Sequence, residues 1–581
     1  MTATAGMHII CERDVACEMR DGTVLRADVY RPDDTGPLPV LLHRIPYGKD
    51  HPLCVTNLMF PPIVAAARGY AVVVQDVRGR GASDGRWEPL RPEASDGYDS
   101  VEWAAAQPWA DGRVGVYGSS YMGVTALQAV AAAPPHLAAA VAYLTGASYH
   151  DGWVHSGGAF ELVFNLRWAA AQALAEAHRT DLDDPDRQAA LARLRWITDN
   201  PFAAARATPL AEVFGPADPL VPYWREWLAR PRRDGYWAAV DARQGLSAAT
   251  VPVLSILGWY DGFLRAHLDA VAALDDALHA GRSPSHEIII GPWDHEAYQG
   301  TRANAAGEEL FGSEAASGAA GLGETILSFF DRVLRPDSAE PTPPEALRVR
   351  YFVVGANQWR RAHRWPPAGD HRRWYLRSDG AGGRTLSPEA PEVSAADTFR
   401  YDPLDPVPTR GGRHLGYWYG RAGIVDQAGL EARDDLLCYT GSHLVEPLEL
   451  AGPVRVRLYA RSGASHTDLT AKLIDVRPDG YAANIAEGIV RVTPDIAVLD
   501  GASPAQVEID LCDVAYRLEA GHRLRLEVAS SNFPRFDRHG NLPGVPAHTA
   551  EEDWAATTQE IRTGPATPSH VSFVVPHGTG H

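Results

Sequence analysis

Short apolar runs alternate with amphipathic segments along the first part of the chain, and the same alternation returns after residue 250. We expect strands at 40–43, 71–75, 114–117, 139–144, 251–257 and 287–290. We expect the intervening helices near 61–68, 97–106, 121–133, 263–274 and 323–334. Apolar strands separated by helices are typical of a parallel sheet that is covered on both faces, so the pattern predicts an α/β domain.

Two other patterns interrupt and follow this alternation. From 153 to 240 the apolar positions follow helical spacing, Trp is frequent and strand signals are absent, which predicts a helical cap inserted into the α/β domain. Residues 336–346 have the Pro-rich composition of a linker. Short alternating strands follow, from 348–354 to 571–575, and predict a β-sandwich of the jelly-roll type.

These patterns divide the chain into three parts. We expect residues 1–146 and 243–345 to form the α/β domain, residues 147–242 the helical cap, and residues 346–581 the jelly-roll β-domain. A length of 581 residues agrees with several domains, because single hydrophobic cores stop growing beyond about 250–300 residues.

Composition and motifs exclude several classes of function. The net charge of −19 argues against a nucleic-acid partner, since phosphates repel an acidic protein. No apolar run is long enough to cross a membrane, and the N-terminus lacks the pattern of a signal peptide. The five cysteines include no Cys-x-x-Cys pair. The glycines at 79–85 lack dinucleotide-loop spacing. We therefore expect a cytoplasmic protein with no metal and no cofactor.

Residues 115–123, Gly-Val-Tyr-Gly-Ser-Ser-Tyr-Met-Gly, carry the strongest chemical signal. A predicted strand runs into a glycine and a serine, and a helix begins almost at once. This is the layout of a nucleophile elbow, in which a sharp turn exposes a serine hydroxyl above the sheet. Ser120 is the better nucleophile, because Ser119 would have a bulky tyrosine at each flanking position. A Gly-Ser turn before a buried helix is the alternative, since Gly123 comes one residue late for the usual motif.

Two later strand ends supply partners for this serine. Asp261 follows the strand at 251–257, and His295 follows the strand at 287–290. Catalytic groups of open α/β sheets gather at the carboxyl ends of the strands, and hydrolases of this type order the triad as Ser, Asp, His. A lone Asp or His in a loop is usually just solvated, but their joint occurrence predicts a triad of Ser120, Asp261 and His295.

An acyl-transfer site also needs hydrogen-bond donors for the developing oxyanion. The backbone N–H of Tyr121, directly after the serine, is one candidate. The hydroxyl of Tyr47, in the loop after the strand at 40–43, is the second. The residues alone leave another interpretation open, in which Tyr47 packs beside the strand end.

Five ordered motifs carry a family resemblance: Ile45-Pro-Tyr-Gly-Lys, Asp76-Val-Arg-Gly-Arg-Gly, Gly118-Ser-Ser-Tyr-Met-Gly, Gly258-Trp-Tyr-Asp-Gly and Gly291-Pro-Trp-Asp-His. Together they resemble the cocaine esterase family of serine hydrolases, which is related to X-prolyl dipeptidyl peptidases and α-amino-acid ester hydrolases. The resemblance implies an α/β-hydrolase domain, a helical cap and a jelly roll. It also implies that Ser120 is the nucleophile, His295 the base and Asp261 its orienting acid, with the Tyr47 hydroxyl and the Tyr121 amide as the oxyanion hole.

The resemblance further implies that Trp153, Trp168 and Phe263 form the aromatic wall of an acyl pocket. The residues alone fit packing in the core of the cap equally well. Met122 adds an apolar side chain near the nucleophile, and we find no carboxylate cluster for a substrate ammonium group. A substrate with a free α-amino group is therefore not supported.

The main hypothesis is hydrolysis of a carboxylic ester with a bulky aromatic or apolar acyl group through an acyl-enzyme. X-prolyl-type peptidase or amidase action, or acyl transfer in a biosynthetic pathway, would use the same triad. A binding protein with a degenerate hydrolase core is the non-enzymatic alternative. We expect a small-molecule ester or amide as partner, no membrane partner, and by analogy a homo-oligomer, either a dimer or a tetramer.

Overall fold

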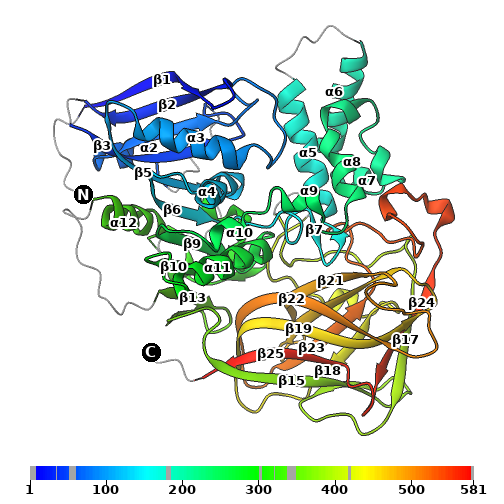
Figure 1. The fold of residues 1–581 in the computed structure, drawn as a ribbon. Helices are drawn as coiled ribbons and strands as arrows, with labels where there is room; N and C mark the ends of the chain where they lie inside the picture. The colour runs from blue at the N-terminus through cyan, green and yellow to red at the C-terminus, as the bar shows by residue number, and fades with distance from the viewer. Residues whose placement is uncertain are drawn as a thin grey trace.

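The computed structural model describes residues 8–33, 36–50, 60–177, 185–299, 304–318, 321–335, 348–415 and 420–577. An α/β domain, a helical cap and a β-domain meet at a common junction. The cap stands beside the α/β domain and above the β-domain (Figure 1). The linker expected at 336–346 lies outside the described residues. None of the helices among the described residues combines the length and the apolar composition that spanning a bilayer requires.

Ten strands of the described chain form one mixed sheet in the order β1-β2-β4-β3-β5-β6-β9-β10-β13-β14. From β4 to β13 each strand pairs in parallel with its neighbour. The strands are β1 (Ile9–Glu18), β2 (Val24–Pro32), β3 (Leu38–Ile45), β4 (Ala71–Asp76), β5 (Ala110–Ser119), β6 (Leu137–Tyr143), β9 (Val253–Gly258), β10 (His286–Gly291), β13 (Val349–Val353) and β14 (Gln358–Ala362).

This sheet continues past residue 345, the predicted end of the domain. The strand at 348–354 was expected in the β-domain, but β13 lies parallel to β10 and β14 pairs beside it. By its pairing, the strand at 348–354 therefore belongs to the sheet of the α/β domain. The local pattern of apolar residues predicts that a segment is a strand. Which sheet the strand joins depends on the strand with which it forms hydrogen bonds, and that strand is distant in the sequence.

Alternate side chains of the central strands enter two different cores. Val72 and Val74 of β4 belong to one hydrophobic core, which also contains residues of α2 and α12. Val73 belongs to a second core, which contains residues of α3, α4, α10 and α11. Successive strand side chains point to opposite faces, so an unbroken apolar strand is one that is buried on both. The helices are α2 (Pro62–Ala67), α3 (Glu93–Ala105), α4 (Ser120–Ala132), α10 (Arg243–Leu246), α11 (Leu264–His279) and α12 (Leu322–Leu334).

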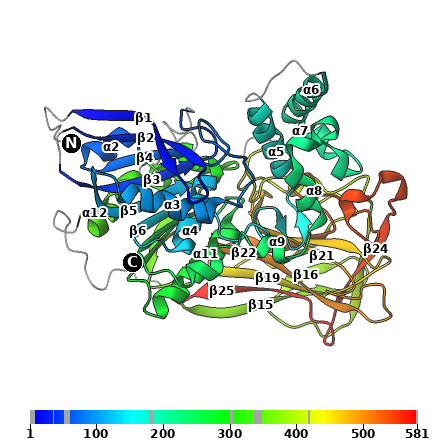
Figure 2. The same cartoon turned by 45° about the horizontal axis from the view of Figure 1, so that its top comes forward.

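The cap lies in sequence between β6 and β9 and is mostly helical, as predicted. It also contains a hairpin of two-residue strands, too short to give a period-two signal in the sequence. In a second view the cap helices again stand beside the α/β domain and over the β-domain (Figure 2). The cap elements are β7 (His155–Ser156), β8 (Ala159–Phe160), α5 (Leu162–Ala177), α6 (Pro185–Asp199), α7 (Pro201–Ala205), η1 (Leu210–Glu212), η2 (Gly215–Leu220), α8 (Pro222–Ala229) and α9 (Gly235–Ala238).

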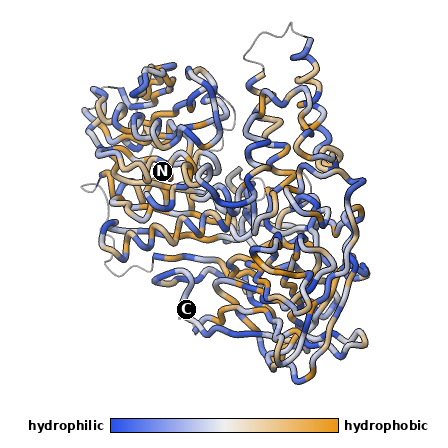
Figure 3. The backbone as a smooth tube through the Cα atoms, turned by 45° about the vertical axis from the view of Figure 1, so that its right-hand side comes forward, coloured by the Kyte–Doolittle hydropathy of each residue, from blue (hydrophilic) through white to orange (hydrophobic). Residues whose placement is uncertain are grey.

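Some strands of the β-domain, such as β19 and β24, alternate buried with more exposed positions, whereas every residue of β20 is buried. Hydrophobic and hydrophilic stretches alternate along the described parts of the chain (Figure 3). The strand order is β17-β24-β19-β25-β15-β16-β18-β23-β20-β21, with β22 beside β19. The strands are β15 (Gly369–Ser378), β16 (Arg384–Ser387), β17 (Ala395–Tyr401), β18 (Leu437–Thr440), β19 (Leu448–Ser462), β20 (Thr467–Val476), β21 (Ala482–Val492), β22 (Ala505–Leu518), β23 (Arg523–Ala529), β24 (Thr557–Thr563) and β25 (His570–Pro576).

Buried ion pairs join the cap to the β-domain. Arg535 of the β-domain binds Glu161 of the cap through two hydrogen bonds of 3.1 and 3.2 Å, and also binds Glu487. Asp537 accepts a hydrogen bond from the amide of Phe160 at 2.8 Å. These contacts fix the start of α5, because the cap chain enters that helix directly after Glu161.

Candidate active site

Ser120 lies at the junction of β5 and α4 and is the first residue of the helix. Its φ of 55° is left-handed, a conformation that non-glycine residues adopt rarely and that the surroundings must hold in place. A Cβ on Gly118 would lie 2.3 Å from the carbonyl of Met122, and one on Gly123 would lie 2.6 Å from Thr145. Both close approaches require glycine, so the late Gly123 is compatible with a nucleophile elbow.

The structure brings the three predicted triad side chains together at the carboxyl ends of β5, β9 and β10. His295 Nε2 lies 3.0 Å from Ser120 Oγ, and His295 Nδ1 lies 2.5 Å from Asp261 Oδ2. Because the carboxylate can only accept, Nδ1 carries a proton and the neutral ring leaves Nε2 to accept from the serine hydroxyl. This is the geometry of a serine, a general base and the acid that orients it.

The carboxylate of Asp261 is held by the turn in which it lies. The amide of Phe263 donates to Oδ1 at 2.6 Å, which leaves Oδ2 for His295. The amide of Tyr260 donates to the carbonyl of Trp293 at 3.0 Å, so the loops after β9 and β10 are joined directly. Asp261 is only 1% exposed, and its orientation is set by these contacts rather than by water.

The loop after β6 holds both backbone groups of Ser120. The Ser120 amide donates to the carbonyl of Leu144 at 3.2 Å, and the Thr145 hydroxyl donates to the Ser120 carbonyl at 2.7 Å. The Thr145 amide donates to Nδ1 of His267 at 3.4 Å, and burial lowers the pKa of His267 to about 3, which keeps that ring neutral. The sequence analysis missed Thr145, because its local sequence carries no catalytic motif.

Tyr47 lies in the loop after β3 and contacts the cap. The indole N–H of Trp168 donates to the Tyr47 hydroxyl oxygen at 3.3 Å. An indole nitrogen can only donate, so the Tyr47 oxygen accepts and its own proton stays free for another acceptor. Burial raises the pKa of Tyr47, which keeps the hydroxyl protonated.

Tyr121 offers its backbone rather than its side chain. Its hydroxyl accepts from the amide of Leu90 at 2.8 Å and donates to Glu93 at 2.9 Å, so the phenol is fully used in the core. Its amide lies in the first turn of α4, where backbone N–H groups have no acceptor within the helix. A helix N-terminus with an unused N–H beside a serine is suited to stabilise negative charge.

The turn after β4, which the charged motif at 76–81 forms, braces the Tyr47 loop. Asp76 accepts from the amides of Lys49 at 2.5 Å and Ala82 at 2.8 Å. Arg80 donates to the carbonyl of Pro46 at 2.6 Å and to the side chain of Gln172 in α5 at 2.8 Å. The only signal in the sequence is the charged, glycine-rich turn, which resembles an imperfect dinucleotide loop.

The three predicted pocket residues are almost completely buried around the triad. Trp153 stacks on Phe263 with ring centres 3.6 Å apart, and Phe263 meets the His295 ring edge-on at 5.0 Å. Trp168 stacks on Tyr121 at 6.2 Å. These aromatic rings belong to one hydrophobic core that the cap and the α/β domain share. Trp153, Trp168 and Phe263 are therefore core residues and also lie close to the catalytic residues.

A parallel sheet with a strained serine between strand and helix, followed in chain order by an aspartate and a histidine at later strand ends, defines an α/β-hydrolase. The helical cap and the β-domain complete an architecture of three parts, as predicted.

The chain belongs to the cocaine esterase family of serine hydrolases. The cocaine esterase of Rhodococcus sp. (strain MB1 Bresler) is 35% identical over 579 residues, which cover 96% of this chain and 97% of that protein. The sequence profile of the X-Pro dipeptidyl-peptidase (S15) family matches residues 21–297. The profile of the X-Pro dipeptidyl-peptidase C-terminal non-catalytic domain matches residues 341–572.

Two solved structures share the whole architecture. An aminopeptidase from the marine sediment archaeon Thaumarchaeota archaeon has a TM-score of 0.80 and 25% identity, covering 98% of this chain and 97% of its own. An α-amino-acid ester hydrolase also has a TM-score of 0.80, with 24% identity over 99% of this chain and 98% of its own. The second likeness supports the fold alone. The predicted fold class and family are confirmed.

Proposed function

We propose that the chain hydrolyses carboxylic esters of small molecules through an acyl-enzyme, with Ser120 as the nucleophile. The observation that carries this proposal is the 3.0 Å approach of His295 Nε2 to Ser120 Oγ, with Asp261 on the other ring nitrogen. The similarity to an enzyme named cocaine esterase supports an ester as the substrate.

The reaction begins when Ser120 Oγ attacks the carbonyl carbon and its proton passes to His295 Nε2. Asp261 holds the imidazolium in place and stabilises its charge. The Tyr47 hydroxyl and the Tyr121 amide donate hydrogen bonds to the oxyanion. When the intermediate collapses, the C–O bond to the leaving group breaks and the departing alcohol takes the proton from His295.

Deacylation repeats these steps with water as the nucleophile. His295 removes a proton from the water, the resulting tetrahedral intermediate collapses, and Ser120 leaves with its proton restored. The acyl group lies against Trp153, Trp168 and Phe263, so a bulky aromatic or apolar acyl group suits the site. The contact of the Phe263 ring with His295 and the stacking of Trp153 on Phe263 support this assignment.

Fluorophosphonate labelling and ester turnover test the proposal together. We expect the wild-type protein to be labelled at Ser120 and to release p-nitrophenol from p-nitrophenyl esters. We expect Ser120→Ala to lose both properties and to unfold at the same temperature. Undiminished turnover in Ser120→Ala would contradict the assignment of the nucleophile.

Peptidase or amidase action is the second candidate. The X-Pro dipeptidyl-peptidase profiles and the similar archaeal aminopeptidase favour it. The same triad can cleave an amide if His295 protonates the departing amine. Comparing kcat/KM for Xaa-Pro anilides with kcat/KM for simple esters decides between the two, and a preference for the anilide would replace the ester proposal.

The remaining expectations from the sequence stay predictions. These are the cytoplasmic location, the homo-oligomer and the domain boundaries. Light scattering on the purified full chain measures the oligomeric state.

A further inference from the structure

Two arginines and a serine form a row across the outer face of the β-domain, on three neighbouring strands. Arg373 of β15 and Arg455 of β19 both pair in register with Ser572 of β25, which lies between them. Strands in a sheet lie about 4.8 Å apart, so two spacings separate the two arginines by about 10 Å along the row. The three residues share one face, because side chains opposite each other in register point to the same side.

A second row lies beside the first. His570, two residues before Ser572 on β25, pairs with Arg457 of β19. Both rows border a surface cavity of ≈ 220 Å³, and six of its nine lining residues are Arg or His, against one acidic residue, Glu508. This concentration of positive charge runs against the composition of a chain whose net charge is −19.

The guanidinium groups of the first row, those of Arg373 and Arg455, have no hydrogen bond or ion pair within the described part of the chain. Arg455 lies opposite Asp510 in register, but Asp510 already binds Arg265 at 3.4 Å and the amide of Cys512 at 2.7 Å. The other nearby carboxylate, Glu508, binds Arg457 at 3.2 Å. The nearby acids are therefore engaged with other partners, and neither of them pairs with Arg373 or Arg455.

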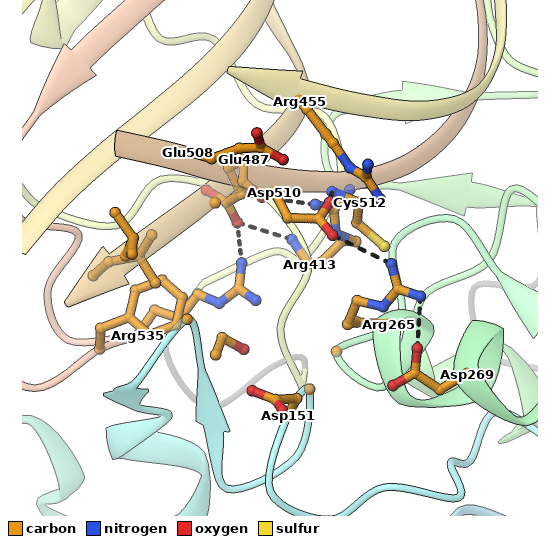
Figure 4. A pocket seen from close by; sticks show the side chains of 18 residues that line it. Asp151, Arg265, Asp269, Arg413, Arg455, Glu487, Glu508, Asp510, Cys512 and Arg535 are labelled. Carbon is orange, nitrogen blue, oxygen red and sulfur yellow. Dashed lines mark hydrogen bonds and ion pairs between the residues drawn. The ribbon is translucent and has the colours of Figure 1, made fainter. Parts of the chain in front are cut away.

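In a neighbouring cavity, by contrast, most arginines are paired within the protein. Arg455 and Glu508 also line a cavity of ≈ 440 Å³ at the junction of the three domains (Figure 4). There Arg265 binds Asp269, Arg535 binds Glu487, and Arg413 donates to the Glu487 carbonyl. Those arginines are satisfied by the protein itself, so the unpaired charge lies on the side of Arg455 that faces Arg373.

We propose that this face binds a small, multiply charged oxyanion of the phosphate or sulfate type between Arg373 and Arg455. Guanidinium groups donate in pairs to oxyanion oxygens, and two of them on opposite sides neutralise a dianion. The Ser572 hydroxyl lies between them and donates to the Arg455 carbonyl at 3.3 Å, so the two guanidinium groups are the donors to the anion. A volume of ≈ 220 Å³ suits such an anion or the phosphate group of a small metabolite, since pockets for larger ligands measure about 300–1,000 Å³.

The lowered pKa of His570 agrees with positive charge in its surroundings. Burial lowers the pKa of His570, a hydrogen bond to the Pro568 carbonyl opposes the change, and the charges of Arg373 and Arg457 reinforce it. A bound anion would offset these two charges.

Isothermal titration calorimetry with inorganic pyrophosphate on the full chain, at fixed ionic strength, tests the proposal. The test variant is the double substitution R373Q/R455Q. The matched control is R377Q, because Arg377 lies on the same strand outside the cavity and is paired with Glu389 at 3.3 Å. We expect wild type and R377Q to bind alike and R373Q/R455Q to bind at least tenfold more weakly.

Thermal unfolding and ester turnover serve as controls for folding, and both should be unchanged in all three proteins. Equal binding to wild type and R373Q/R455Q overturns the proposal, as does the absence of saturable binding to wild type up to about 10 mM pyrophosphate. Titrations with inorganic phosphate and with glycerol 3-phosphate then separate the two sources of the anion. Tighter binding of the ester assigns the site to a phosphorylated metabolite, and tighter binding of inorganic phosphate assigns it to the free anion.

Discussion

The substitution Tyr47→Phe tests the oxyanion assignment, because it removes one hydroxyl and leaves the ring in place. Trp168 donates to the Tyr47 oxygen at 3.3 Å, so the hydroxyl proton is left for another acceptor. If that acceptor is the oxyanion, losing the donor costs about 2.7–4 kcal/mol of transition-state stabilisation, which lowers kcat about 10²–10³-fold.

The same reasoning predicts how the loss divides between kcat and KM. The oxyanion carries its full charge only in the transition state, so Tyr47→Phe should lower kcat and leave KM within about threefold of wild type. The variant also leaves the Trp168 N–H without its acceptor, which should lower the free energy of unfolding by about 1 kcal/mol.

Steady-state hydrolysis of a p-nitrophenyl ester measures both constants, and urea unfolding measures stability. Trp168→Phe is the comparison variant, since it keeps the Tyr47 hydroxyl and removes the indole N–H that donates to it, together with part of the aromatic wall. We expect its loss in kcat to be clearly smaller than that of Tyr47→Phe. The reasoning is refuted if Tyr47→Phe keeps more than about a third of the wild-type kcat, because Tyr47 then only packs beside the strand end.

Three further predictions follow from the same structure. Thr145→Val removes the hydroxyl that binds the Ser120 carbonyl and should lower kcat about tenfold, whereas Thr145→Ser should restore it; equal rates in the two variants would exclude a positioning role. Phe263→Ala should raise KM for bulky aromatic esters more than for acetate esters. An equal change in KM for both would show that Phe263 does not contact the acyl group. Burial lowers the pKa of His43 to about 4, so the unfolded state binds a proton between pH 6.5 and 4 that the folded state does not. Stability should therefore fall on the order of 3 kcal/mol over that range, and urea unfolding of His43→Gln should show a smaller fall.

The sequence by itself determined the features that depend on residues close together in the chain. Unbroken apolar strands between helices were enough to predict a sheet covered on both faces. The elbow around Ser120 could also be recognised locally, because the close approach of Gly118 to the next turn of the chain excludes larger residues. The order of Asp261 and His295 after the serine pointed to the triad, since parallel strands end at the same edge.

Only the tertiary structure decided which distant groups meet. The sheet that receives β13, the Thr145 contact to the Ser120 carbonyl and the Trp168 contact to Tyr47 join segments whose local patterns carry no sign of one another. The tertiary structure also decides that Arg455 has no acidic partner. Asp510, the carboxylate opposite Arg455, binds Arg265, which lies 190 positions before Arg455 in the chain. Hydrogen bonds form between atoms that folding brings within about 3 Å, and a pattern read along the chain does not contain those distances.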